Sequence, residues 1–397
     1  MRKPVLTIFY QFDPWHSSIG GIQTLIRAFI KYAPDEFVMR LVGTTNQAIQ
    51  RVGQWQDAEL EGTLLHFMPL LRLESDDVRK RVPTTLKYTA ALMGQHFVSD
   101  FMHFHRLEPS LMAYRWTADK TLFVHNDISQ QMVSVNGKNA ILWRRFPAAY
   151  FVLERLLVPQ FNQILSCNSR STELYRCRYP AIAQRVNQVK NSVDTAVFYP
   201  VSRAERNQLR ADYTRKLGIS ADTRLILFAG RLHPQKDPLL LVDAFVALNQ
   251  PDTHLLIAGQ GELAPQVRLR IEQRNLTKRV SLLGGVTQTE MAKLHRLSHV
   301  FVLTSAYEGL PLVALEALAS GTPVVTTDCG ETPNLLTAQS GVVCQERTVA
   351  AIATALHKVL SHPDHYPADA CVQVAAPYAA QQVIHGIYSD MLSRWRA

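Results

Sequence analysis

The sequence predicts an α/β protein with two domains, and three observations lead to this prediction. Short apolar runs rich in β-branched residues alternate with amphipathic helical patterns along nearly the whole chain. This alternation is typical of stacked βαβ units around a buried parallel sheet. The 397 residues exceed the usual size of one domain, because domains commonly hold roughly 100 to 200 residues. Finally, a polar, proline-containing stretch interrupts the alternation near residue 200.

Each half of the chain contains a series of predicted strands. In the first half they are VLTIFY from Val5, VMRLVGT from Val38, TLLHFM from Thr63, FMHFH from Phe101, TLFVH from Thr121 and NQILSC from Asn162. In the second half they are RLILFAG from Arg224, HLLIAG from His254, VSLLG from Val280, VFVLTS from Val300, PVVTT from Pro323 and GVVC from Gly341. We therefore expect two Rossmann-like domains, over residues 1–198 and 199–379, that face each other across a cleft. Ligands of such folds bind at the carboxyl ends of the strands.

The last segment, residues 380–397, predicts an amphipathic helix. Its apolar residues recur at intervals of three and four, which places them on one helical face. They are Val383, Ile384, Ile387, Tyr388, Met391, Leu392 and Trp395. This face must pack on another element, but the periodicity does not decide which domain provides it.

Charge and cysteine content narrow the class of protein. The formal net charge of +9 favours an anionic partner. A nucleic-acid partner is disfavoured, because the basic residues are scattered and no zinc finger, basic zipper or RNA-binding aromatic motif occurs. The five cysteines lack a C-x-x-C pair, which argues against a disulfide framework or a zinc site and fits a reducing cytoplasm. No apolar run reaches the roughly 18 residues of a membrane span, so we expect a soluble or peripheral protein.

The segment SAYEGLPLVALEALASGTPVVTTD is the most informative part of the chain. Glu308 follows a predicted strand at a turn with Gly309 and Pro311, and Glu316 lies inside the apolar run LVALEALA. Burial of an unpaired carboxylate is costly, so such a group should be paired or should hold polar groups of a ligand. Carboxylates bind sugar and ribose hydroxyls well, and a helix that starts at Leu312 offers free N–H groups to a diphosphate. The alternative is a loop glutamate followed by a surface glutamate.

A second motif, LFAGRLHPQKDPLLLVDAF, places basic side chains after a predicted strand. Gly230 ends the strand, and Arg231 and Lys236 follow in a loop that leads into a helix. Two fixed cations at this position can stabilise a diphosphate, and more strongly when it leaves with a negative charge. A solvated basic loop is the alternative interpretation.

Two weaker features occur in the first half. Gly20 and Gly21 follow the first predicted strand and open a helix, so the backbone there could approach a ligand closely and adopt unusual dihedral angles. An ordinary tight turn fits the same pattern. His125 ends the predicted strand TLFVH and could reach a ligand there, although a single histidine is more often structural.

These motifs resemble those of a known family. The spacing of Glu308 and Glu316, with GRLHPQKDP, LLIAGQGE and VSLLGGV, resembles the retaining glycosyltransferases of family 4, which share the two-domain GT-B fold. The resemblance covers most of the second half. It is looser in the first half, through the paired glycines, HFH at 103–105, FVHND and VKNSVDTAVFYP. The chain departs from the family in reading Asn191-Ser192 where Asn-Gly is usual.

The resemblance implies a role for each matching residue. Glu316 would hold the nucleotide ribose and Glu308 the hydroxyls of the transferred sugar. Arg231 and Lys236 would hold the diphosphate, and His125 would line the sugar site. Further donor-binding positions implied by the resemblance are Gly20, Gly21, Gly230, Gly259, Leu283, Gly284, Gly309, Leu310, Leu312 and Val313. It also implies that the C-terminal helix returns to the first domain.

The implied reaction transfers a sugar from a nucleotide diphosphate-sugar to an acceptor hydroxyl with retention of configuration. The resemblance implies front-face attack, in which the leaving diphosphate takes the proton of the acceptor. No metal or other cofactor is expected, since the sequence contains no Asp-x-Asp pair. The donor base, the sugar and the acceptor are not specified by the sequence, because fold does not fix substrate.

Three other classes of protein match part of the sequence: an NAD-dependent dehydrogenase, another enzyme with the same fold, and a binding subunit without catalytic activity. AGQGELA matches the glycine pattern of a dinucleotide-binding site, but no acidic residue lies between Glu272 and Glu290, where such a site needs one. A nucleotide-sugar 2-epimerase or a sugar phosphorylase would share the fold. A catalytically silent binding subunit is the third, although the donor-site residues are present.

Contact with a membrane is suggested by the basic and aromatic segments RKR at 79–81 and WRRF at 143–146.

Overall fold

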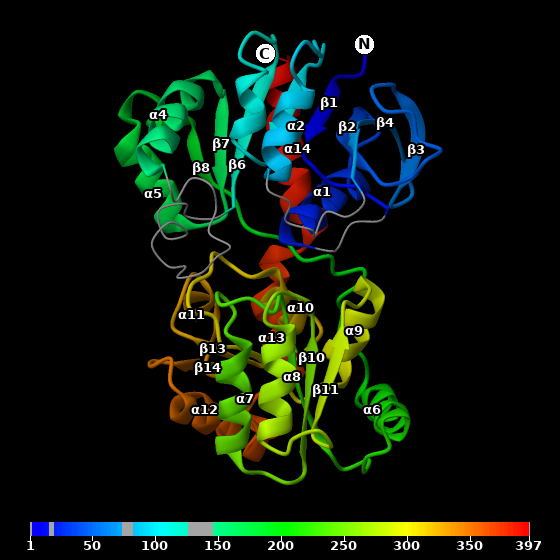
Figure 1. The fold of residues 1–397 in the computed structure, drawn as a ribbon, viewed down its shortest axis with the longest axis vertical. Coiled ribbons are helices and arrows are strands. Elements are labelled where there is room, and N and C mark those ends of the chain that lie inside the picture. The colour runs from blue at the N-terminus through cyan, green and yellow to red at the C-terminus, as the bar shows by residue number, and fades with distance from the viewer. Residues whose placement is uncertain (1, 16–19, 74–81, 126–145, 397) are drawn as a thin grey trace. The chain divides into compact units, whose positions relative to one another are not determined.

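The structure, a computed structural model, describes residues 2–15, 20–73, 82–125 and 146–396. The chain divides into two compact units, one formed by Met1–Lys190 with Ala380–Ala397 and the other by Asn191–Ala379. Each unit contains one sheet with helices on its faces (Figure 1). The α/β class predicted from the sequence is confirmed.

The first unit has an eight-stranded sheet in the order β3-β4-β2-β1-β5-β6-β7-β8. Every pair is parallel except β3 with β4. The chain starts at β1 and winds outward in both directions, so the order reverses between β1 and β5. The strands are β1 (Val5–Phe9), β2 (Val38–Thr45), β3 (Gln56–Leu60), β4 (Thr63–Arg72), β5 (Phe101–Phe104), β6 (Asp119–Val124), β7 (Gln163–Ser166) and β8 (Val186–Gln188).

Two of these strands, β3 and β8, were not predicted. The sequence of β3, QDAEL, carries three polar side chains and lies at the edge of the sheet. It pairs with β4 through a two-residue turn in which Glu61 and Gly62 both have positive φ, as a tight hairpin requires. The edge strand β8 has only three residues, too few for a periodic signal.

The second unit has a six-stranded sheet in the order β11-β10-β9-β12-β13-β14, with all pairs parallel. All six correspond to predicted strands. Here the order reverses between β9 and β12. The strands are β9 (Arg224–Ala229), β10 (Thr253–Ala258), β11 (Val280–Gly284), β12 (Val300–Leu303), β13 (Val324–Thr327) and β14 (Gly341–Cys344).

The helices of both units connect the strands and cover the sheets. In the first unit they are α1 (Gly21–Lys31), α2 (Thr84–Ala91), α4 (Pro147–Leu157), α5 (Ser169–Arg178) and α14 (Ala380–Arg396). In the second unit they are α6 (Arg203–Leu217), α7 (Pro238–Leu248), α8 (Ala264–Gln273), α9 (Gln288–Leu297), α10 (Leu312–Ala319), α11 (Thr332–Leu335), α12 (Val349–Ser361) and α13 (Ala368–Ala375).

Both faces of the second sheet carry an apolar core. Ile226 and Phe228 point to one face, where they pack with residues of α7, α8 and α12. Leu225 and Leu227 point to the other face, with residues of α9, α10 and α13. This alternation follows from the two-residue period of a strand, and burial on both faces explains why β9 reads as a continuous apolar run.

The helix α14 packs on α1 within the first unit. Its predicted apolar face is the buried one, with Ile384, Ile387, Tyr388 and Met391 in the core. The Tyr388 hydroxyl donates to the backbone oxygen of Phe29 over 2.8 Å. Near the end of the helix, Arg394 pairs with Asp119 of β6 over 2.7 Å.

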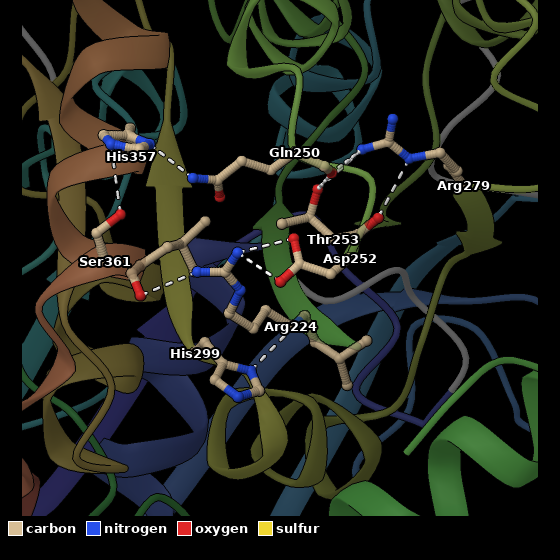
Figure 2. A network of polar contacts seen from close by, with 10 residues as sticks. Arg224, Gln250, Asp252, Thr253, Arg279, His299, His357 and Ser361 are labelled. Carbon is tan, nitrogen blue, oxygen red and sulfur yellow. Dashed lines mark hydrogen bonds and ion pairs between the residues drawn. The ribbon is translucent and has the colours of Figure 1, made fainter. Parts of the chain in front are cut away.

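Polar side chains join the amino ends of the strands in the second unit (Figure 2). Arg224, the first residue of β9, forms an ion pair with Asp252 over 2.6 Å. The His299 ring accepts a hydrogen bond from the backbone N–H of Leu225 over 3.0 Å. Arg279 reaches Thr253 at the start of β10. This network fixes the end of the sheet where the strands begin.

Candidate functional site

The candidate site of the second unit lies where its strand order reverses. The strands β9 and β12 are neighbours in the sheet. The helices that follow them, α7 and α10, cover opposite faces of this sheet. Two loops therefore diverge from the carboxyl ends of these strands, residues 230–237 after β9 and residues 304–311 after β12. In open α/β sheets this is the position where ligands bind.

Hydrogen bonds tie the two loops together. The backbone N–H of Ala306 donates to the oxygen of Gln235 over 2.8 Å, and the Gln235 side chain donates to the oxygen of Tyr307 over 3.0 Å. The Thr304 hydroxyl donates to the oxygen of Lys236 over 2.7 Å. These bonds fix the two loops relative to each other.

Lys236 and Glu308 meet between these loops. The ammonium group of Lys236 forms an ion pair with Oε1 of Glu308, and the Ser305 hydroxyl donates to the same oxygen over 2.6 Å. The two side chains are only 15% and 9% exposed. The pair thus places a cation and a carboxylate, both largely removed from water, at one point of the sheet edge.

The backbone around Lys236 is also fixed. Asp237 adopts a left-handed conformation (φ 46°) and caps α7 by accepting a hydrogen bond from the N–H of Leu240. Its other carboxylate oxygen pairs with Arg347 over 2.6 Å. The aliphatic part of Lys236 lies over Gly230, at 3.6 Å from the position that a Cβ would occupy. Neighbouring residues therefore fix both the backbone and the side chain of Lys236.

Two glycines allow close approach of backbones around the site. A Cβ on Gly259 would lie 1.9 Å from the oxygen of Gly230, and the φ of Gly259 is +146°. A Cβ on Gly330 would lie 2.3 Å from the oxygen of Gly309, and the φ of Gly330 is +66°. Only glycine fits at either position. The sequence analysis singled out Gly259 but not Gly330.

The helix α10 begins at Leu312, directly after the Glu308 loop. Its N-cap is Pro311, and no side chain caps its first turn. The N–H groups of Leu312 and Val313 belong to the positive N-terminal end of the helix, which suits an anion. Before the helix, the oxygen of Leu310 accepts a hydrogen bond from the Asn191 side chain over 2.7 Å.

Glu316 lies in α10 and is 8% exposed. Its Oε2 lies 3.8 Å from Nε2 of His295. His295 of α9 is fully buried, and neither of its ring nitrogens has a hydrogen-bond partner among the described residues. A buried carboxylate with one imidazole beside it keeps hydrogen-bonding capacity for a ligand.

The remaining predicted positions of this unit lie around the same sheet edge. Arg231 is exposed on the loop after β9, and it forms no ion pair with any residue that the structure describes. Leu283 and Gly284 end β11. The oxygen of Gly284 accepts a hydrogen bond from the N–H of Gly259 over 2.7 Å, so that oxygen is already engaged.

In the first unit, the paired glycines differ from expectation in one respect. Gly20 is the N-cap of α1 and is extended (φ −129°, ψ 164°), a conformation open to any residue. Gly20 therefore does not use the unusual dihedral angles that are open to glycine. Gly21 is the first residue of α1, and the N-cap residue Gly20 provides no side-chain cap for this helix.

His125 follows β6 directly, and the structure adds a partner for it. Its Nε2 lies 3.0 Å from Nδ1 of His105, which follows β5. Burial lowers the pKa of His125 to about 3 and the pKa of His105 well below its usual value. Both rings are therefore neutral near neutral pH.

Three residues at the site were missed by sequence reasoning. Ser305, His295 and His105 each contact a predicted residue, namely Glu308, Glu316 and His125. The HFH motif was noted without a role for His105. For His295 no signal existed, because it lies in α9 and meets Glu316 only after folding.

The described residues contain neither a candidate metal site nor a helix that could span a membrane. No group of three or more His, Cys, Asp or Glu residues in the described ranges could hold a metal ion. Among the described helices, none is long and apolar enough to cross a membrane. The RKR segment at 79–81 and residues 143–145 of WRRF lie outside the described residues.

Comparison with known sequences gives matches to part of the chain. Residues 210–371 match the family described as "Glycosyl transferases group 1". A D-inositol 3-phosphate glycosyltransferase of Jonesia denitrificans is 31% identical over 193 residues, which cover 46% of this chain and 45% of that relative. The match thus spans about half the length of this relative.

Solved structures match the whole chain at low sequence identity. A sucrose-phosphate synthase from Thermosynechococcus elongatus has a TM-score of 0.80 at 16% identity and covers 99% of this chain and 100% of its own. HepE of Anabaena in complex with UDP-glucose has a TM-score of 0.69 at 14% identity, with coverage of 98% and 100%. These likenesses show the fold, and they confirm the predicted GT-B class.

Proposed function

The second unit belongs to the glycosyl transferases of group 1, and on this premise we propose that the chain is a retaining glycosyltransferase. It moves a sugar from a nucleotide diphosphate-sugar to a hydroxyl of a glycan, a glycolipid or a small molecule. The observation that supports this function best is the Lys236–Glu308 pair close to the uncapped start of α10. A cation and free N–H groups suit a diphosphate, and a carboxylate suits sugar hydroxyls.

The diphosphate is bound by Lys236, Arg231 and the first N–H groups of α10 in this proposal. Lys236 is fixed by its loop, whereas Arg231 is exposed and has freedom to reach a ligand. Gly230, Gly309, Leu310, Leu312 and Val313 provide backbone beside the phosphates. Cations that are in place before the reaction stabilise the charge that develops on the leaving group.

The sugar and the nucleoside are bound by the two glutamates. Glu308 accepts hydrogen bonds from sugar hydroxyls, and Glu316 accepts them from the ribose. The backbone near Leu283 and Gly284 holds the base, and Gly259 keeps the adjacent loop close to Gly230. In the first unit, we propose Gly20, Gly21 and His125 as ligand-binding positions.

The transfer is a single displacement at the anomeric carbon. The acceptor oxygen forms a bond to this carbon on the face from which the diphosphate oxygen departs. The acceptor proton passes to the departing diphosphate, so that charge and atoms balance. Lys236 and Arg231 stabilise the diphosphate as the bond to it breaks.

A panel of nucleotide-sugars tests this function. UDP-, GDP- and ADP-sugars are incubated with the protein, and UDP-glucose comes first because HepE was solved with it. Release of nucleoside diphosphate supports transfer. Conversion of the nucleotide-sugar to an epimer, or the absence of any change, would instead indicate an epimerase or a silent subunit.

We propose that the reaction needs no metal ion. Lys236, Arg231 and the start of α10 already supply positive charge where a metal would otherwise act. Activity should therefore survive EDTA. Loss of activity in EDTA with rescue by Mg²⁺ or Mn²⁺ would contradict this part of the proposal.

We further propose a cytoplasmic protein that contacts membranes at its periphery. The helix α4 exposes Val152, Arg155 and Leu156 on one face, and Phe146 precedes the helix with 59% exposure. Exposed apolar and basic residues on one helical face suit an anionic lipid surface. Co-sedimentation with anionic liposomes should weaken in a Val152→Ser, Leu156→Ser variant, and equal binding of both proteins would contradict the proposal.

A further inference from the structure

His105 and His125 form a direct ring-to-ring hydrogen bond. The residues follow the neighbouring strands β5 and β6, and Nδ1 of His105 lies 3.0 Å from Nε2 of His125. The two ring planes differ by 15°. The ring centroids are 5.2 Å apart, about as far as this N···N distance allows, so the rings lie edge to edge and nearly coplanar. The lone pair of an imidazole nitrogen lies in the ring plane, and this arrangement therefore suits an N–H···N hydrogen bond.

The surroundings of His105 hold its ring in place. Its face packs on the Phe123 ring, with centroids 4.7 Å apart and planes 10° apart. The Tyr10 ring makes a T-shaped contact with it, with centroids 6.1 Å apart. His105 is 2% exposed. The orientation of the ring is thus set by packing.

The hydrogen bond contains one proton, and either ring could supply it. If His125 donates from Nε2, neutral His105 carries its own proton at Nε2. That nitrogen is buried and has no partner among the described residues. Buried N–H groups without a partner are rare because they cost the full desolvation of a donor. If His105 donates from Nδ1 instead, its Nε2 has no proton and is an unpaired acceptor, which buried sites contain more often than an unpaired N–H.

We propose that His105 is a positioning residue that donates from Nδ1 to Nε2 of His125, so that His125 carries its proton at Nδ1. His125 then offers a hydrogen-bond donor, and the ligand atom that it binds is an acceptor, a hydroxyl or phosphate oxygen of the nucleotide-sugar. This inference rests on the proposed function only for the identity of the ligand. The lowered pKa of each ring, caused mainly by burial, agrees with a neutral pair.

Two substitutions separate the hydrogen bond from the packing. In His105→Asn, the side-chain amide nitrogen can take the place of Nδ1 and still donate to His125. In His105→Leu, the apolar contact with Phe123 is kept in part, but no donor remains. An imidazole without this constraint prefers the proton at Nε2, so His105→Leu should switch the tautomer of His125.

The test is a long-range ¹H–¹⁵N correlation spectrum of protein labelled with ¹⁵N-histidine, without any ligand. His125 is assigned by the signals lost in His125→Gln. We expect a protonated Nδ1 and an unprotonated Nε2 for His125 in the wild type and in His105→Asn, and the reverse in His105→Leu. A wild-type His125 protonated at Nε2, or an unchanged tautomer in His105→Leu, would overturn the inference.

Turnover of the nucleotide-sugar gives a second readout. His105→Leu should lower kcat/KM by about 10- to 100-fold, as loss of an orienting partner commonly does, and His105→Asn should restore most of it. Equal loss in both variants would indicate a packing role. The spectra need no substrate, so the tautomer test does not depend on turnover. If the protein turned over no nucleotide-sugar, only the proposed function would be contradicted. If His105→Leu does not fold, the wild type and His105→Asn still decide.

Discussion

Lys236 and Glu308 form a largely buried ion pair that joins the loop after β9 to the loop after β12. The partners are far apart in sequence and meet because β9 and β12 are neighbours at the reversal of strand order. Ser305 supplies a second donor to the carboxylate. A buried pair of this kind gives little net stability but costs much when one partner is removed.

A double-mutant cycle should detect this coupling. Lys236→Met leaves Glu308 buried with Ser305 as its remaining donor, and we expect a loss of about 3 kcal/mol in the free energy of unfolding. In the double variant with Glu308→Gln the charge is gone as well, so the combined loss should be smaller than the sum by roughly 1 to 3 kcal/mol. Urea unfolding measures all four proteins. Strictly additive losses would show that the two side chains do not interact.

Glu316 should govern donor affinity more than turnover. Glu316→Gln keeps the shape of the side chain and removes its charge, so hydroxyls of the ribose lose their strongest acceptor. We expect the donor KM to rise by about tenfold, which corresponds to one charged hydrogen bond of roughly 1.5 kcal/mol. Steady-state kinetics with the preferred donor give this value, and Glu272→Gln on the exposed face of α8 serves as the control. An unchanged KM with a strongly reduced kcat would contradict the assignment to the ribose.

Two glycine substitutions should act in opposite directions. Gly259→Ala places a Cβ 1.9 Å from the backbone oxygen of Gly230 at a φ of +146°, and we expect a loss of several kcal/mol or failure to fold. Gly386→Ala in α14 meets no atom within 4 Å and should stabilise the protein by about 1 kcal/mol through helix propensity. Thermal unfolding measures both. A Gly259→Ala protein as stable as the wild type would contradict the close approach of these loops.

Stability of the second unit should fall as the solution becomes acidic. Burial, aided by the charge of Arg279, lowers the pKa of His254 from 6.5 to about 4. Burial, followed by nearby arginines, lowers the pKa of His299 from 6.5 to about 3. Above pH 6.5 both histidines are neutral in the folded and in the unfolded chain. Below it only the unfolded chain binds protons, so the free energy of unfolding decreases as pH falls toward 4.

The His254→Gln variant tests this origin of the pH dependence. Glutamine does not titrate and can still bond the Ser281 hydroxyl, which lies 2.8 Å from Nε2 of His254. We expect a shallower decline of the urea midpoint between pH 6.5 and pH 4 than in the wild type. The same slope in both proteins would assign the pH dependence to other groups.

The sequence predicted most of the fold because its signals are local. Each strand from Val5 to Cys344 with an apolar, β-branched run was identified, since burial on both faces makes such a run continuous. Edge strands escape this rule. The polar β3 is stabilised by its hairpin with β4, and such pairing is a tertiary property that no local pattern of QDAEL reveals.

The same difference between local and tertiary signals applies to the site residues. Lys236, Glu308 and Glu316 stood out because charged side chains next to strand ends or within apolar runs conflict with their setting. Their partners did not stand out, because contacts such as His295 with Glu316 and His105 with His125 form between distant elements. Gly20 shows that a sequence pattern can also suggest more than the structure contains. It is extended, because a pair of glycines in the sequence does not require unusual dihedral angles.

The most direct test of the account is the rate at which nucleoside diphosphate is released from the preferred nucleotide-sugar in the presence of EDTA. The wild type is compared with Lys236→Ala and with Lys358→Ala, which removes an exposed lysine of α12. We expect equal rates for the wild type and Lys358→Ala, and a rate at least about 100-fold lower for Lys236→Ala, because one charge-stabilising group is lost. Equal release by Lys236→Ala, or no release by the wild type from any nucleotide-sugar, would contradict it.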